Sequence, residues 1–314
     1  MTARLSLSTM WAKYHYEDLY EFSCAAKAWG YDAIEANAYV KTADMLERLA
    51  EGPLPLSSLH NPIPNLQSTR EIRSYDLNLA GVDEDERQEA LSFVRKSILN
   101  AARLGASAVV LHMGHVPISK AMQRRLHEMW HAGMMGTDEY RDLYLRITTL
   151  RAEGEEQHLE RAVQTLHDVE PLAADNGVML GVETRHNIHE LPNIDEAAVM
   201  LSETNPAVVG YWHDTGHAAT HDRLGHVAHE EWLRRYSDRL IGIHLHDMNF
   251  ERDHQCPGAG EIDWDMIARY LPSSAIRVCE LGEWNTRDCV ERTPEFMERV
   301  GICATGTYSS EPLQ

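Results

Sequence analysis

The chain is poor in paired cysteines, in positive charge and in long apolar runs, and each shortage excludes a class of protein. Its five cysteines are odd in number and form no CxxC pair, which argues against a disulfide framework or a zinc knuckle and favours a reducing compartment. Lysine and arginine number 29 against 49 aspartates and glutamates, and the formal net charge is −20. Such a charge repels nucleic-acid backbones and anionic lipid.

No run approaches the ~20 apolar residues that a membrane-spanning helix needs. The first residues, MTARLSLSTMW, contain no apolar stretch typical of a signal peptide. We therefore expect a cytoplasmic protein that binds neither nucleic acid nor membrane.

What the chain does contain is an alternation of short β-rich runs with longer segments of helical period. Eight strands are predicted, at 5–10, 33–36, 56–60, 108–112, 179–183, 208–214, 241–246 and 276–280. Helices are predicted between them, for example at 16–29, 83–104, 155–176, 195–203 and 230–236. A chain of 314 residues with 43% apolar content can bury one large core. Eight strand–helix units with right-handed crossovers predict an α/β protein, a (β/α)8 TIM barrel.

Segment 117–154 is longer than the few residues that usually join a strand to a helix. It follows the fourth predicted strand, so by topology it lies at the face where the strands end. A lid or partner-contact helix and an extended crossover that only packs both remain open. We expect residues 1–303 to form a single TIM-barrel domain with this insertion, and the polar residues 304–314 to form a flexible tail.

Metal-binding side chains stand at the ends of the predicted strands. The runs GVE, YWHDTGH, IGIHLHD and VCE contain, in this order, Glu183, Asp214 with His217, His244 with His246, and Glu280. Two earlier runs, SSLHN and AVVLHMGH, contain His60 and His112. Because the carboxyl ends of parallel strands meet at one mouth of a barrel, these side chains predict a divalent-metal site there. Carboxylates with one imidazole suit Mn²⁺, Mg²⁺ or Co²⁺, and further imidazoles shift the preference toward Zn²⁺.

Two of these histidines share one strand. Residues two apart on a strand face the same way, so His244 and His246 point to the same side. One of them can bind metal at the mouth, and the other is expected one layer deeper or behind the ligands.

In this order, the strings SSLHN, VVLHMGH, GVET, WHDTGHA, HLHD, PGAGEIDW and CELG resemble the xylose isomerase-like TIM-barrel superfamily. This superfamily includes ketose 3-epimerases, inosose isomerases and dehydratases, and endonuclease IV, and the resemblance covers residues 5–284. The epimerase branch implies one Mn²⁺-type ion held by Glu183, Asp214, His244 and Glu280. It also implies that Glu183 and Glu280 act as acid and base on opposite faces of the sugar carbon.

The endonuclease IV branch implies three zinc ions. A second Zn²⁺ would lie at His60, His112 and Glu183, and a third would use His217 and His254. That branch carries Asp-x-His before its Gly-x-Gly, whereas this chain has Arg252 at the position of the carboxylate, although a shifted Asp253 would be a substitute. Together with the net charge of −20, the arginine argues against a DNA-repair enzyme.

Each candidate residue also has a structural alternative. If no metal binds, the carboxylates at the mouth would form salt bridges across it. If they are not metal ligands, His60, His112 and His217 would bind a substrate hydroxyl or hydrogen-bond to a metal ligand. Arg185 would meet a substrate carboxylate or phosphate, or one of the many acidic side chains. Trp11 would wall a sugar pocket or only pack. A structural role is expected more often than a functional one for His115, His186, His189, His213 and His246.

The favoured function is that of a metal-dependent isomerase or epimerase of a keto-sugar, a cyclitol or a sugar derivative. The metal would stabilise an enediolate while the two glutamates remove and return a proton. The alternatives are a sugar or inosose dehydratase, a zinc-dependent phosphodiesterase of the endonuclease IV type, and a non-catalytic barrel. The expected partners are a small carbohydrate and further copies of the chain.

Overall fold

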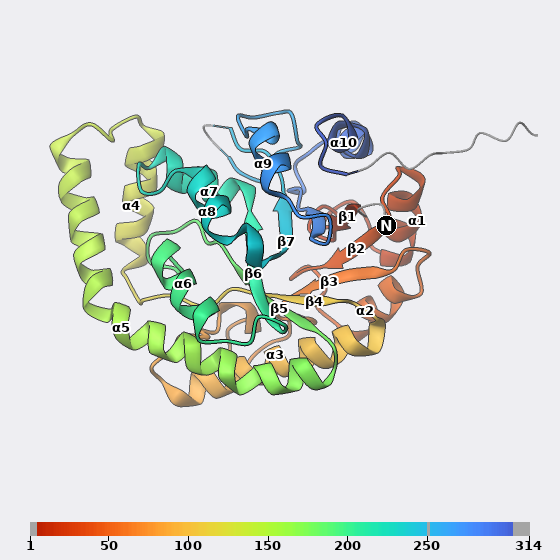
Figure 1. Ribbon diagram of the computed structural model, residues 1–314, viewed down its shortest axis with the longest axis horizontal. Helices are drawn as coiled ribbons and strands as arrows, with labels where there is room; N and C mark the ends of the chain where they lie inside the picture. Colours follow the sequence, from red (N-terminus) through yellow and green to blue (C-terminus); the bar gives the residue numbers. More distant parts are fainter. Residues whose placement is uncertain (1–4, 250–251, 304–314) are drawn as a thin grey trace, which may run out of the picture.

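The computed structural model describes residues 5–249 and 252–303 and shows a closed barrel of parallel strands, which confirms the predicted fold (Figure 1). The strands pair in chain order, and the first pairs with the last. They are β1 (Leu5–Ser8), β2 (Ala33–Ala36), β3 (Leu56–His60), β4 (Ala108–Leu111), β5 (Met179–Glu183), β6 (Val209–Asp214), β7 (Leu240–Leu245) and β8 (Ile276–Cys279).

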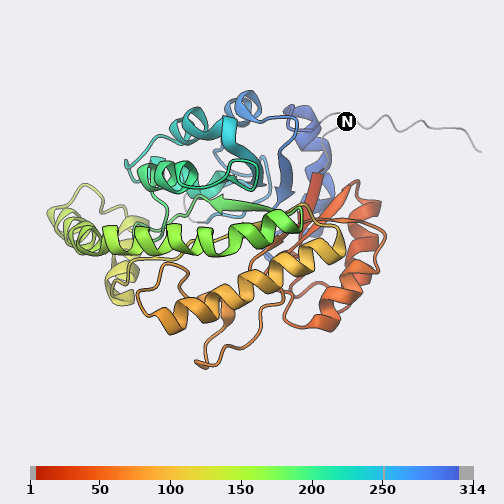
Figure 2. The ribbon, with the colours of Figure 1, turned by 60° about the horizontal axis from the view of Figure 1, so that its bottom comes forward.

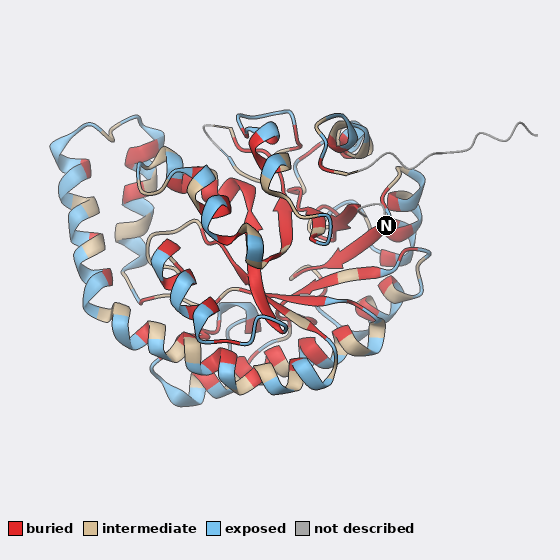
Figure 3. Cartoon of the chain, viewed as in Figure 1, coloured by how far each residue is buried: buried red, intermediate tan, exposed pale blue. Residues whose placement is uncertain are grey.

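Helices cover the outside of this barrel (Figures 1 and 2). They are α1 (Leu19–Ala28), α2 (Ala43–Ala50), α3 (Glu84–Leu104), α4 (Lys120–His131), α5 (Asp138–Asp175), α6 (Ile194–Ser202), α7 (Thr215–Arg223), α8 (His229–Tyr236), α9 (Trp264–Tyr270) and α10 (Arg287–Arg299), with short 3-10 helices η1 (Ser74–Asp76) and η2 (Ser237–Arg239). Figure 3 shows the strands buried and the outward helix faces exposed. Among the described residues, no helix is long and apolar enough to cross a membrane.

The barrel interior is filled beneath the mouth by one large side chain, Trp212 of β6, which is fully buried. Glycines on strands β5 and β7 make room for it. A Cβ atom added at Gly181 would lie 2.8 Å from the Trp212 ring, and one at Gly242 would lie 2.1 Å from it. The centroid of the Trp212 ring lies 5.2 Å from that of His244, so Trp212 fills the layer of the barrel interior next to the residues of the mouth.

Segment 117–154 contains α4 and the first part of α5, which pack against each other beside the barrel (Figure 1). Helix α5 begins at Asp138, capped by the Thr137 side chain, and not at residue 155 as predicted. Gly154 does not break it. A Cβ atom there would lie 2.7 Å from the Val116 side chain, so glycine permits close packing inside a continuous helix. That residues 1–303 form a single domain stays a prediction, and the predicted tail 304–314 lies outside the described residues.

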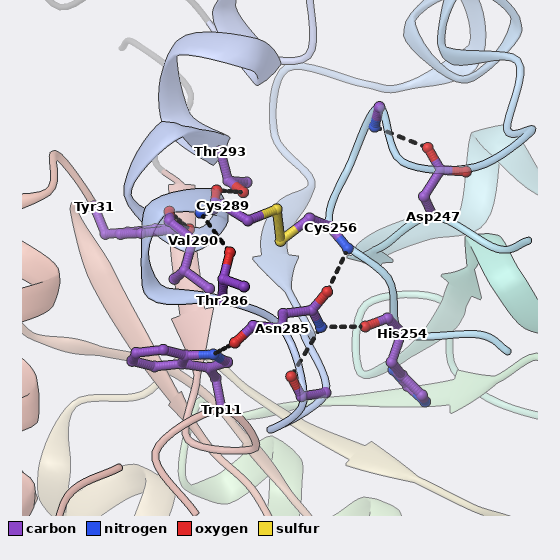
Figure 4. The surroundings of a disulfide bond; sticks show 12 residues. Trp11, Tyr31, Asp247, His254, Cys256, Asn285, Thr286, Cys289, Val290 and Thr293 are labelled. Atoms are coloured by element: carbon purple, nitrogen blue, oxygen red, sulfur yellow. Dashed lines mark hydrogen bonds between the residues drawn. A yellow bond between two sulfur atoms is a disulfide. The ribbon is translucent and has the colours of Figure 1, made fainter.

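The cysteine pattern argued against a disulfide framework, and this prediction is wrong for one pair. Cys256 and Cys289 form a disulfide bond (Figure 4). These cysteines stand 33 residues apart, one in the loop after β7 and one in the first turn of α10. Only the three-dimensional fold brings them together, so no local spacing pattern reveals them. Beside them, the Asn285 side chain accepts a hydrogen bond from the Cys256 N–H at 3.0 Å and donates one to the His254 carbonyl at 2.8 Å. The loop after β7 is therefore fixed to the start of α10.

Candidate metal centre

Four side chains from adjacent strands meet at the carboxyl mouth of the barrel. Glu183 ends β5, Asp214 ends β6, His244 lies on β7, and Glu280 follows β8. One donor atom from each residue lies within 4.8 Å of those of the others, and all four residues are buried. Nδ1 of His244 is the common neighbour, at 3.1 Å from Glu183 Oε1, 3.3 Å from Glu280 Oε2 and 3.7 Å from Asp214 Oδ2. The structure thus brings together the four residues predicted as metal ligands.

The donor set fits a divalent cation. Three buried carboxylate groups surround one imidazole nitrogen, and such a concentration of acidic groups away from water is costly unless a cation lies among them. Three carboxylates beside one imidazole suit a metal that accepts oxygen and nitrogen donors. Glu183, Asp214, His244 and Glu280 would hold such an ion.

The electrostatics keep two of these carboxylates ionised, as metal ligands must be. Burial by itself raises the pKa of Glu183, but His112 and His244 outweigh burial and hold this pKa well below its usual value. Burial likewise raises the pKa of Asp214, and His217 and His246 hold it well below the usual range. Burial lowers the pKa of His244, but Glu280 and Glu35 raise this pKa by more than burial lowers it. The pKa of His244 therefore lies well above its ordinary value.

Asp214 is oriented by groups behind the centre. It is the N-cap of α7, and its Oδ1 accepts a hydrogen bond from the His217 N–H at 2.8 Å. The same oxygen lies 3.0 Å from Nε2 of His246, whose Nδ1 accepts from the His254 N–H at 2.9 Å. His246 therefore carries its ring proton on Nε2 and donates it to Asp214. This leaves Oδ2 facing the centre and assigns His246 a supporting position.

His244 is oriented in the same way by Glu35, which was not among the site residues predicted from the sequence. Oε1 of Glu35 lies 3.1 Å from Nε2 of His244, and the Ser58 hydroxyl donates to Oε2 of Glu35 at 2.7 Å. Glu35 and His244 are both fully buried. A carboxylate on the far nitrogen fixes the imidazole tautomer and makes the near nitrogen a better metal ligand. The only sequence signal was an acidic residue inside the apolar strand β2.

His60 and His112 approach Glu183 from strands β3 and β4. Their Nε2 atoms lie 3.3 and 2.7 Å from Glu183 Oε2. His60, Glu183 and His244 form a further group whose donor atoms lie within 4.8 Å of one another. Nε2 of His112 already accepts a hydrogen bond from Nη1 of Arg185, at 2.5 Å, and is therefore not free to bind a metal. Burial, followed by Arg185, lowers the pKa of His112 to about 3.

Arg185 is fixed in this position by Glu190. The Arg185 Nη2 and Nε atoms lie 2.8 and 3.2 Å from Glu190 Oε1, and Nη1 lies 3.5 Å from Glu183 Oε2. The guanidinium thus contacts both His112 and Glu183, two of the residues that would hold the second Zn²⁺ of the sequence hypothesis. Such an ion would have to displace Arg185.

The remaining candidates lie at different depths. His217 is buried beside the four ligands, with Nδ1 3.5 Å from Asp214 Oδ2 and 3.7 Å from Glu183 Oε1. His254 places Nδ1 2.9 Å from the Glu280 carbonyl oxygen. Arg252 packs over Trp284, with its guanidinium carbon 4.6 Å from the ring centroid. Trp11 is buried in the core, where its indole N–H donates to the Asn285 carbonyl at 2.9 Å, and a role as a sugar-stacking wall stays a prediction.

A polar cavity of about 440 Å³ adjoins the centre on the β3–β4 side. Its wall includes Tyr75, His112, Arg185 and Glu190, and the loop after β3 supplies much of the rest. The cavity is large enough for a small polar ligand, since ligand sites usually range from ~300 to 1,000 Å³.

The sequence matches the xylose isomerase-like TIM barrel family over residues 24–300. The chain belongs to this family. An uncharacterized protein, y4fM, from Sinorhizobium fredii (strain NBRC 101917 / NGR234) is 27% identical over 232 residues. That match spans 73% of this chain and 62% of the relative, so the chain spans less than two thirds of the relative's length.

Solved structures share the fold of this family at low sequence identity. A D-tagatose 3-epimerase-like protein has a TM-score of 0.66 and 19% identity, and the match covers 95% of this chain and 96% of that one. The IOLI protein, solved with a binding zinc atom, has a TM-score of 0.64 and 15% identity, over 95% of this chain and 98% of that one. The match to the family over residues 24–300 confirms the predicted superfamily.

Proposed function

We propose that the chain is a divalent-metal-dependent isomerase or epimerase acting on a keto-sugar, a cyclitol or a related sugar derivative. The observation that carries this proposal is the position of the two glutamates. Glu183 and Glu280 reach the same His244 nitrogen, at 3.1 and 3.3 Å, from strands β5 and β8. Two carboxylates around one metal position are the pair that proton removal and proton return require.

The ion would be Mn²⁺, Co²⁺, Mg²⁺ or Zn²⁺, and as a Lewis acid it would stabilise negative charge on the substrate oxygens. One of Glu183 and Glu280 would remove the proton next to the substrate carbonyl and leave an enediolate. The other would return a proton. Return to the opposite face of the same carbon gives epimerisation, and return to the neighbouring carbon gives isomerisation. Burial of both glutamates excludes water that would otherwise exchange or quench the intermediate.

The fold neighbours support this proposal, because one is a D-tagatose 3-epimerase-like protein and another was solved with a binding zinc atom. A small carbohydrate would occupy the cavity beside Arg185 and Tyr75. Homo-oligomer formation and a cytoplasmic location stay predictions. The Cys256–Cys289 bond removes the cysteine-based argument for a reducing compartment.

The test is incubation with a panel of ketoses and inososes in ²H₂O after loading with each metal. An active substrate would gain one carbon-bound deuterium as its epimer or isomer forms. Glu183→Gln and Glu280→Gln should each lower kcat by ~10²–10⁴-fold, the usual contribution of acid–base catalysis. Glu283→Gln is the matched control, since Glu283 pairs with Lys13 outside the centre. Full activity in either glutamine variant that retains its metal would refute the two-glutamate scheme.

A further inference from the structure

The loop after β7 reaches the metal centre through one backbone N–H group. The N–H of His254 donates to Nδ1 of His246 at 2.9 Å, and Nε2 of His246 lies 3.0 Å from Oδ1 of Asp214. Nδ1 can accept this bond only while it carries no proton, so the ring proton is held on Nε2 and faces Asp214. His254 therefore acts on a metal ligand that it does not touch.

The His254 backbone is strained where it makes this contact. Its φ angle is 49°, in the left-handed region that is uncommon for a residue with a side chain. Such a conformation persists only where the surrounding contacts enforce it, and it is often found where a functional group is being held in place. The position of the His254 N–H therefore depends on what fixes the loop around it.

An asparagine and a disulfide fix this part of the loop (Figure 4). The Asn285 side chain donates to the His254 carbonyl at 2.8 Å and accepts from the Cys256 N–H at 3.0 Å. Cys256, two residues beyond His254, is bonded to Cys289 in the first turn of α10. The disulfide thus adds a covalent link to the hydrogen bonds that hold the strained backbone.

Helix α10 gives this disulfide a firm anchor. The Thr286 side chain caps the helix by accepting from the Cys289 N–H. In the same turn, the Tyr31 hydroxyl donates to the carbonyl of the fully buried Val290 at 2.9 Å. The position of Cys289 is therefore set by the helix and not by the loop, so opening the bond would release the loop.

The two bonded cysteines differ in their access to solvent. Cys256 is 1% exposed, whereas Cys289 is partly buried and lines a cavity of about 470 Å³ together with Gly258 and Phe296. A small thiolate in this cavity can attack Sγ of Cys289. The sulfur–sulfur bond then breaks, and Sγ of Cys256 leaves with the electron pair and takes up a proton. A second thiol displaces the first as its own disulfide and leaves both cysteines reduced.

We propose that the Cys256–Cys289 disulfide positions the metal ligand Asp214, and that its reduction by a small thiol weakens binding of the ion. With the bond open, the strained backbone relaxes and the His254 N–H leaves His246. Nδ1 of His246 is then free to carry the proton in place of Nε2, and Asp214 loses its donor. The proposal rests on the metal centre of the proposed function, but not on which sugar that centre transforms.

The test compares Mn²⁺ affinity in the two redox states of the full-length protein. Oxidised protein is treated with reduced glutathione, freed of it by gel filtration without oxygen, and titrated with Mn²⁺ while electron paramagnetic resonance follows the free ion. Mn²⁺ prefers oxygen and nitrogen donors to thiolates, so the released cysteines add no competing site. Reduced wild type and the double variant Cys256→Ser, Cys289→Ser should bind Mn²⁺ about tenfold more weakly than oxidised wild type, as is usual when a group behind a metal ligand is lost.

His246→Phe separates positioning from a general loss of stability. It removes the ring nitrogens that link His254 to Asp214, so reduction of this variant should leave its Mn²⁺ affinity nearly unchanged. Equal weakening by reduction in His246→Phe and wild type would contradict the route through His246. Cys24→Ser, at an exposed free cysteine, is the matched control and should respond to glutathione as wild type does.

Amide hydrogen exchange of metal-free wild type gives a second readout, which needs no variant. The peptide that contains His254 should exchange faster after reduction, because its N–H loses the His246 acceptor. A disulfide that glutathione does not open, equal Mn²⁺ affinity in the two redox states, or unchanged exchange would overturn the proposal. Failure of the oxidised protein to bind Mn²⁺ at all would instead overturn the metal centre, and this proposal with it.

Discussion

Glu35 and His244 are joined across the barrel, with Oε1 of Glu35 3.1 Å from Nε2 of His244, so that the opposite ring nitrogen faces the three carboxylates of the centre. Since both side chains are fully buried, the pair fixes the imidazole without help from solvent. Glu35 then acts as a positioning residue whose effect appears in metal affinity.

Glu35→Gln should weaken binding of the first ion by ~10–100-fold, as is usual when the outer partner of a metal-binding histidine is altered. The glutamine side-chain oxygen can still accept a hydrogen bond from His244. It carries no negative charge, so it makes the opposite ring nitrogen a weaker metal ligand than glutamate does. Competition with a chromophoric chelator measures this affinity directly. Glu283→Gln, which changes a carboxylate paired with Lys13 outside the centre, serves as the comparison, and an unaltered affinity in Glu35→Gln would remove the positioning role.

Arg185 should exclude a further cation from the neighbourhood of His112. The double variant Arg185→Met, Glu190→Gln removes the guanidinium together with its buried partner, so that no unpaired charge remains. His112 Nε2, Glu183 Oε2 and His60 then become available, and the variant should bind one more Zn²⁺ per chain than wild type. The number of Zn²⁺ ions per chain is measured by metal analysis after dialysis. An equal number in the variant and the wild type would mean that Arg185 does not keep a further cation away from His112.

The Cys256–Cys289 bond should stabilise the protein. A bond that closes a loop of 33 residues restricts the unfolded chain by about 4 kcal/mol in the chain-entropy model. Cys256→Ser should lower the free energy of unfolding by roughly that amount, measured by denaturant titration without reductant. Adding dithiothreitol should lower the wild type to the same level, and Cys24→Ser, at an exposed free cysteine, should change nothing. Insensitivity of the wild type to reductant would contradict the pairing.

Acid should destabilise the fold through buried histidines behind β6. Burial lowers the pKa of His229 to about 4, and its Nε2 lies 2.9 Å from Nε2 of His213, whose pKa burial also lowers. Unfolded histidine takes up a proton near pH 6.5, so between pH 6.5 and 4 the unfolded chain binds more protons. The stability contributed by neutral His229 is therefore complete above pH 6.5 and is lost as pH falls toward 4, by roughly 3 kcal/mol.

His229→Gln keeps a hydrogen-bonding group beside His213 but does not titrate. In metal-free protein, its free energy of unfolding should fall less steeply between pH 7 and 5 than that of wild type, by about one proton. Denaturant titrations at several pH values give this slope. Parallel curves for the two proteins would show that His229 is not the titrating group.

The sequence predicted the parts of the centre that follow from strand order. Glu183, Asp214 and His244 end runs of strand period, and a parallel barrel brings such ends to one mouth whatever its loops do. The pairing of Glu35 with His244 spans 209 positions and depends on barrel closure, so Glu35 was not predicted as a site residue.

Side chains presented by loops were harder to predict. His186 was expected to be structural, and Asp253 was considered only as a substitute for the carboxylate that Arg252 replaces. Their approach to His217 depends on how two loops are fixed, one of them by Asn285 and a disulfide. Helix α5 was predicted too short because residues 117–154 were assigned to an insertion, whereas Gly154 packs against Val116 within a continuous helix.

The measurement closest to the central claim is a crystal structure of the Mn²⁺-loaded protein with anomalous scattering recorded for manganese. We expect an anomalous peak within ~2.0–2.4 Å of donor atoms from Glu183, Asp214, His244 and Glu280. A fully loaded crystal with no peak among these four side chains, or with its ion bound elsewhere while they pair only with one another, would contradict it.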